Sequence, residues 1–114
     1  TKQNRDLVLR LAINYGGRAE LNDAVSRLQN SAAGTQLKDC LYEPEMPDVD
    51  LLIRSGGEIR LSNFLPWQTS YAELHFSPVL WPDFTEADLD QALDQYSRRT
   101  RRFGRLPAWD SEAQ

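Results

Sequence analysis

The residues best suited to chemistry in this 114-residue chain directly follow a short apolar run at 49–53. They are two arginines, two serines and a pair of glycines, namely Arg54, Ser55, Gly56, Gly57, Arg60 and Ser62. Arginine presents a rigid fork of donors that suits phosphate oxygens, and glycine lets backbone N–H groups approach an anion closely. The apolar run is typical of a buried parallel strand, and open α/β sheets bind ligands at the carboxyl ends of such strands. The stretch 47–63 therefore predicts a phosphate-binding loop.

A second apolar run, at 7–13, ends in similar residues and also predicts a strand. The residues that follow it are Asn14, Tyr15, Gly16, Gly17 and Arg18. A helix from Ala19 to about Asn30 is expected next, because apolar residues repeat there at helical spacing. A strand, a helix and the strand at 49–53 form a βαβ crossover, which should be right-handed with parallel strands. We therefore expect the two glycine pairs at one edge of a parallel sheet.

The remaining elements are predicted from caps and periodicity. The clearest is a helix from Thr85 to about Phe103, with Thr85 as N-cap, Asp88 three residues later and Gly104 as its end. Short helices are expected at 36–42 and after Ser62 or Asn63, with Pro66 in the first turn of the latter, and a short strand is expected at 74–76. The fold class is accordingly α/β, a parallel sheet with flanking helices.

Composition limits the kind of protein this is. The length suits one domain, and a net charge of −4 disfavours a nucleic-acid partner. The single cysteine, Cys40, permits no internal disulfide and indicates either a reducing compartment or a buried, inert thiol. We expect a cytoplasmic protein. No apolar run approaches the roughly 20 residues of a membrane span, and the polar start predicts no signal peptide. The lack of an initiator Met predicts that residue 1 is not the native start.

Five stretches resemble, in the family's order, motifs of the cis-prenyltransferases, the undecaprenyl diphosphate synthase family. The longest is 50–68, and the others are 14–18, 71–74, 80–84 and 101–104. The resemblance covers nearly the whole chain to Gly104. It implies an enzyme that condenses isopentenyl diphosphate with an allylic diphosphate to make a Z-polyprenyl diphosphate. It also implies Mg²⁺ as cofactor, a homodimer, and peripheral contact with the lipid product.

The resemblance also assigns roles to individual residues. Arg54, Arg60 and Ser62 would hold the diphosphate of isopentenyl diphosphate, and Glu73 would help to coordinate Mg²⁺, across the dimer. The residues implied for substrate binding are, in full, Arg54, Arg60, Ser62, Arg102, Gly104, Asn14 and Arg18. Of these, Arg102 and Gly104 match an element that reaches the substrate phosphates of the partner subunit.

Departures from the family pattern bear on activity. The N-terminal half of the family is absent, and with it an Asp-Gly-Asn-Gly-Arg-type loop that carries the catalytic aspartate. We therefore expect no catalytic residue in this chain and no turnover by the chain alone. Residues 1–104 should form the C-terminal portion of the enzyme, with the isopentenyl diphosphate site and the dimer interface, and 105–114 a flexible tail. Ile59 stands where relatives often have a polar residue, and Pro66 where Leu is usual.

Plainer interpretations remain open beside these. The chain could be a non-catalytic subunit that binds a catalytic prenyltransferase partner. Glu73 could simply pair with an arginine, and His75 could be a packing residue. The arginines at 98–102 could be a solvated helix end, which the helix dipole favours. A phosphate- or RNA-binding module is disfavoured by the net charge of −4.

Overall fold

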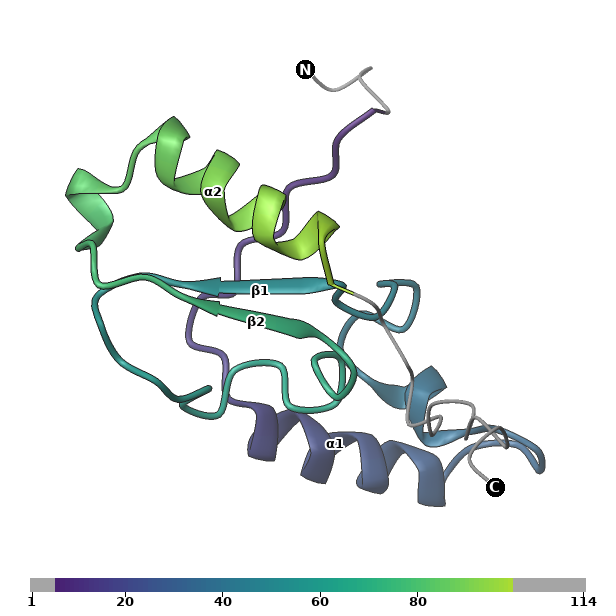
Figure 1. Ribbon diagram of the computed structural model, residues 1–114. Coiled ribbons are helices and arrows are strands. Elements are labelled where there is room, and N and C mark those ends of the chain that lie inside the picture. The colour runs from purple at the N-terminus through teal and green to yellow at the C-terminus, as the bar shows by residue number, and fades with distance from the viewer. Residues whose placement is uncertain (1–5, 100–114) are drawn as a thin grey trace, which may run out of the picture. The chain divides into compact units, whose positions relative to one another are not determined.

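The computed structural model describes residues 6–99 of the chain, which fall into two compact units (Figure 1). The described part of the first unit comprises 6–46 and 61–66, and that of the second comprises 47–60 and 67–99. Arg60 and Leu61 therefore mark a boundary inside the stretch predicted to bind phosphate. No helix among residues 6–99 is long and apolar enough to cross a membrane.

The second unit contains a parallel pair of strands, β1 (Leu51–Arg54) and β2 (Glu73–Phe76) (Figure 1). Leu51 lies opposite Glu73, and Arg54 lies opposite Phe76. Both strands were predicted, at 49–53 and 74–76, with ends that differ by one or two residues. In the described part of the chain the sheet consists of these two strands, so the predicted α/β class with parallel pairing is confirmed at this coarse level.

Helix α2 (Glu86–Ser97) belongs to the same unit and begins where its cap predicts. Asp88 accepts hydrogen bonds through Oδ2 from the backbone N–H of Thr85 at 2.8 Å and from its hydroxyl at 2.6 Å. The helix ends at Ser97, so the prediction that it continues to about Phe103 is wrong for Arg98 and Arg99. Residues 100–103 of the predicted helix lie outside the described residues. Figure 1 shows α2 alongside the strands, and Ile53 of β1 and Leu89 of α2 line one hollow. The short 3₁₀ helix η2 (Trp81–Asp83) leads into α2.

The first unit is built on helix α1 (Gly17–Gln29) and the 3₁₀ helix η1 (Leu37–Cys40). Its core consists of Ala24, Cys40 and Leu41, with Leu21, Leu28 and Leu37 packed around them. The predicted apolar face of the helix at 19–30 was Leu21, Ala24, Val25 and Leu28. Three of these four pack in this core, whereas Val25 is 46% exposed. The helix itself is confirmed and begins two residues earlier than predicted. The helix predicted at 36–42 is found as the shorter η1.

Two predicted elements are absent. Residues 7–13 form no strand, and Leu7, Leu9 and Ile13 are 79–82% exposed. A strand exists only when a neighbour accepts its hydrogen bonds, and the sheet within residues 6–99 joins only β1 to β2. The predicted βαβ crossover through α1 is therefore wrong as well.

The helix predicted after Ser62 or Asn63 is also wrong, because residues 62–71 form turns and bends. The backbone φ angles of Ser62, Asn63 and Leu65 are 49°, 64° and 47°. These lie in the left-handed region, which a right-handed helix cannot contain. The sequence contains a capping residue and an apolar face of helical spacing, but the left-handed backbone angles of this turn prevent a helix from forming.

Replacement of Asp88 by Asn should lower the midpoint of unfolding at pH 7. The hydrogen bonds from Thr85 hold the pKa of Asp88 below its ordinary value of 3.8. The ionised carboxylate therefore stabilises the fold fully above pH 3.8, and this contribution is lost as the pH falls through the lower pKa of the folded protein. The difference between the parent and the variant should accordingly shrink in acid. Asp90→Asn removes a charge from the same helix without touching the cap, and an equal loss in this control would contradict the interpretation.

Candidate functional site

Arg54 and Arg60, the two arginines predicted to bind phosphate, are connected within the second unit. Arg54 is the last residue of β1 and is half-buried, and its Nη1 donates to the backbone carbonyl of Arg60. Arg60 itself is exposed, and its Nη1 lies 2.5 Å from Oε2 of Glu58. The loop thus folds back so that one arginine fixes the backbone of the other. The exposed guanidinium of Arg60 can leave Glu58 and bind a phosphate instead. Little stability is lost in this exchange, because exposed ion pairs contribute little to the free energy of folding.

The glycine pair at the end of β1 has a different role from the predicted one. The N–H groups of Gly56 and Gly57 donate to the carbonyls of Val79 and Ser77 at 2.7 and 2.9 Å. Their φ angles of 91° and 77° make this geometry accessible, and glycine adopts such angles without strain. The prediction that these amides face an anion is therefore wrong, since the chain after β2 already occupies both donors. A phosphate site here would therefore not use these two amides.

Ser62 and Arg18 come together in the first unit. A shallow hollow is lined by Arg18, Leu21, Ser62, Asn63 and Pro66. Asn63 holds the start of α1, because its carbonyl accepts from the N–H of Gly17 and its Oδ1 from the N–H of Arg18, both at 2.9 Å. Asn14 is exposed, has a left-handed φ of 53° and is not among the lining residues.

The second glycine pair serves close packing. Gly17 is buried, and a Cβ placed on it would lie 2.1 Å from Cδ of Pro66. The turn at 61–66 therefore needs a glycine at position 17, and the unusual Pro66 lies directly against it. Sequence reasoning missed Asn63 as the residue that caps α1. The available signal was the tolerance of asparagine for left-handed angles and its preference for caps.

A buried carboxylate that the sequence did not reveal anchors the start of the first unit. Glu20 is 1% exposed and accepts from the hydroxyl of Tyr15 at 2.5 Å and from the N–H of Tyr42 at 3.1 Å. Burial and the bond to Glu20 raise the pKa of Tyr15 above its ordinary value. Tyr15 and its neighbours are thereby held against α1. The signal was spacing, since Glu20 precedes the buried Ala24 by one helical turn.

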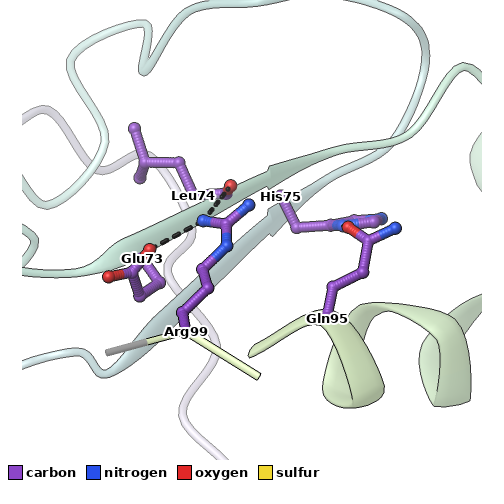
Figure 2. Close-up of polar contacts among 5 residues, drawn as sticks. All are labelled: Glu73, Leu74, His75, Gln95 and Arg99. Atoms are coloured by element: carbon purple, nitrogen blue, oxygen red, sulfur yellow. Dashed lines mark hydrogen bonds and ion pairs between the residues drawn. The ribbon is translucent and has the colours of Figure 1, made fainter. Parts of the chain in front are cut away.

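Glu73, the predicted metal ligand, is paired in this structure. Its Oε2 lies 2.7 Å from Nη1 of Arg99, which also donates to the carbonyl of Leu74 at 3.2 Å (Figure 2). Within residues 6–99 no three His, Cys, Asp or Glu side chains gather into a metal site. One carboxylate nevertheless suits Mg²⁺, which commonly takes one or two protein carboxylates and completes its shell with substrate phosphates and water.

The predicted site residues are thus divided between the two units. Arg54 and Arg60 lie together in one, and Arg18 and Ser62 lie together in the other. Arg102 and Gly104 lie outside the described residues. What the arrangement offers chemically is binding of an anion by guanidinium and hydroxyl groups and a carboxylate for a cation.

Comparison with known proteins gives a consistent result. A family model described as "Putative undecaprenyl diphosphate synthase" matches residues 1–104. An isoprenyl transferase of Rickettsia sibirica is 48% identical over 109 residues, which cover 92% of this chain and 48% of that protein. Isoprenyl transferase 2 of Corynebacterium efficiens is 48% identical over 114 residues, covering 91% of this chain and 47% of that protein. The chain spans about half the length of these curated relatives.

A solved structure is similar over most of the chain. It is the crystal structure of a probable undecaprenyl diphosphate synthase from Campylobacter jejuni, with a TM-score of 0.71 and 38% sequence identity. The match covers 82% of this chain and 45% of the other. The small α/β unit therefore corresponds to part of a larger fold.

Replacement of Gly17 by Ala should destabilise the first unit by about 1–3 kcal/mol, because the new methyl group overlaps Pro66. Gly16→Ala is the matched control and should cost less, since the nearest neighbour of its new methyl group is the side-chain amide nitrogen of Asn63 at 3.2 Å. Chemical denaturation measures both variants. Equal stability of Gly17→Ala and the parent would show that Pro66 does not pack against this position.

Proposed function

This chain belongs to the undecaprenyl diphosphate synthase family, and we propose that it forms the C-terminal portion of a cis-prenyltransferase. The complete enzyme condenses isopentenyl diphosphate with an allylic diphosphate to give a Z-polyprenyl diphosphate. Residues 1–104 carry the isopentenyl diphosphate site and dimer interface, and the tail predicted at 105–114 lies outside the described residues. The aspartate that engages the allylic diphosphate lies upstream, so this chain alone turns over nothing. Coverage of only 45–48% of the similar proteins supports the proposal.

The observation that carries the proposal is the connected pair Arg54 and Arg60 at the end of β1. A diphosphate has several anionic oxygens, and two guanidinium groups on one short loop suit it. Because the side chain of Arg54 holds the backbone at Arg60, the loop is ordered before substrate arrives, which reduces the entropic cost of binding. Ser62 follows two residues later and supplies a hydroxyl donor.

These residues bind and orient the nucleophile. With its diphosphate fixed, the double bond of isopentenyl diphosphate is held in attack geometry toward the allylic carbon. Glu73 would help to hold Mg²⁺, which would supply charge neutralisation for the diphosphate leaving group. The register supports a role for Glu73 in the site of a partner subunit. Glu73 and Arg54 lie at opposite ends of the ladder, three strand positions apart, which corresponds to roughly 10 Å.

A second candidate is a non-catalytic subunit that binds a catalytic prenyltransferase partner. The exposed apolar residues at 7–13 indicate that another segment packs over them. This segment could be an upstream part of the same protein or a separate chain. We propose the first arrangement because Arg54, Arg60, Ser62 and Glu73, which a purely supporting subunit has no need of, are all present. Homodimer formation, with Arg102 and Gly104 reaching the phosphates of the partner subunit, belongs to the same proposal.

Arg60→Ala in the complete enzyme should raise the KM for isopentenyl diphosphate roughly 10- to 100-fold, because a charge-assisted hydrogen bond contributes about 1.5–3 kcal/mol. The KM for the allylic substrate should change little. Steady-state kinetics with each substrate varied in turn measures both effects. Arg60 is preferred to Arg54 for this experiment because Arg54 also supports the loop.

Arg98→Ala is the control for loss of an exposed arginine, since Arg98 pairs with Asp94 on its own helix. An equal rise in KM for both substrates in Arg60→Ala would argue against the assignment.

A further inference from the structure

A polar cluster joins β2 to α2 and to the residues just after it (Figure 2). It does not include Arg54 or Arg60, and its members are Glu73, Leu74, His75, Gln95 and Arg99. Arg99 contacts Glu73 and Leu74, as described above, and Nδ1 of His75 lies 3.1 Å from Oε1 of Gln95. Both contacts link β2 to α2 or to the residues just after it. Arg99 has no role in the proposed binding of isopentenyl diphosphate. Its place beside the proposed metal ligand therefore needs an explanation of its own.

The position of Arg99 is fixed by backbone contacts. Its N–H donates to the carbonyl of Tyr96 at 3.1 Å, in the last turn of the helix. The N–H of the preceding Arg98 donates to the carbonyl of Asp94 at 3.3 Å. An arginine here is also favoured by the dipole of α2. The backbone of Arg99 is therefore ordered, and only its side chain needs further contacts to be held in place.

The side chain is held by two acceptors of different kinds. One is the carboxylate of Glu73, and the other is the main-chain carbonyl of Leu74, which belongs to β2. Because the carbonyl of Leu74 is part of β2, the guanidinium can keep this hydrogen bond to the sheet even if the carboxylate of Glu73 moves. Arg99 contacts Oε2 of Glu73, and among residues 6–99 no side chain forms a hydrogen bond or ion pair with Oε1. The Glu73 side chain is 26% exposed, so solvent and ions can reach it.

We propose that Arg99 is a positioning residue that fixes the carboxylate of Glu73 through Oε2 and leaves Oε1 for the divalent cation. This inference rests on the proposed role of Glu73. Carboxylates that bind metals are themselves hydrogen-bonded in most sites, and loss of such a partner typically weakens binding 10- to 100-fold. The charge of Arg99 opposes a nearby cation, but its side chain is 41% exposed and solvent screens that repulsion. Ordering of the ligand is therefore the larger effect.

The test uses Mn²⁺ as a spectroscopic probe for the divalent site of the complete enzyme. Titration followed by electron paramagnetic resonance gives the affinity directly, without turnover. Arg99→Gln should weaken Mn²⁺ binding about tenfold, and Arg99→Lys should restore part of the loss. Arg98→Gln is the matched control, because it removes a neighbouring charge whose side-chain partner within residues 6–99 is Asp94, and this variant should bind Mn²⁺ as the parent does.

The unfolding temperature measured in EDTA, where no metal is bound, distinguishes a role of Arg99 in positioning Glu73 from a role in stabilising the fold. If Arg99→Gln lowers the unfolding temperature without Mn²⁺ but leaves Mn²⁺ affinity unchanged, Arg99 is only structural and the inference is overturned. Unchanged or tighter Mn²⁺ binding by Arg99→Gln overturns it in any case. Should Arg99→Gln not fold, Arg99→Met is compared with the parent, and equal affinities would again overturn the inference, since methionine keeps an aliphatic stem but makes neither of the two contacts of Nη1.

Glu73→Gln separates this inference from the proposed function. Weaker Mn²⁺ binding in Glu73→Gln with parental binding in Arg99→Gln would leave the metal role of Glu73 standing and remove the role of Arg99. Unchanged binding in Glu73→Gln would remove the metal role and this inference together.

Discussion

The hydrogen-bond ladder between β1 and β2 continues beyond both strands. It begins at the carbonyl of Asp50, which accepts from Glu73, and extends past Arg54, whose carbonyl accepts from Ser77 at 2.8 Å. Gly56 and Gly57 add two further bonds to the segment after β2. This ladder sets where the loop carrying Arg54 and Arg60 leaves the sheet. It also places Glu73 at the opposite end, where Arg99, the second residue after α2, contacts it.

The elements that the sequence predicted correctly are those with local causes. The capping pair Thr85 and Asp88 specifies where α2 begins, and the apolar spacing from Leu21 to Leu28 specifies α1. The apolar run at 49–53 was long enough to indicate β1. In each case the signal and the structure involve residues within a few positions of each other, so no knowledge of the rest of the chain was needed.

The failures have non-local causes. Residues 7–13 have the composition of a strand, but a strand depends on a neighbour that local sequence does not specify. The left-handed angles at Ser62, Asn63 and Leu65 belong to a turn that caps α1, a segment more than 40 residues earlier. The amides of Gly56 and Gly57 are occupied by residues after β2. Residue types alone suggested an anion site there and could not show that the donors were already used.

For the candidate site, the sequence suggested residues but not their partners. It singled out the arginines of the loop, and the structure adds that Arg54 supports the backbone of Arg60. It singled out the carboxylate of Glu73, and the structure adds the contact with Arg99, which lies 26 residues later. Such partners are invisible to pattern and spacing because they depend on how β2 and α2 pack.

The central claim is that this chain holds the diphosphate of isopentenyl diphosphate. A crystal structure of the complete enzyme with isopentenyl diphosphate and Mg²⁺ tests it most directly. The account predicts diphosphate oxygens within about 2.7–3.2 Å of the guanidinium groups of Arg54 and Arg60 and of the hydroxyl of Ser62. A diphosphate bound without contact to any of these three side chains would contradict it.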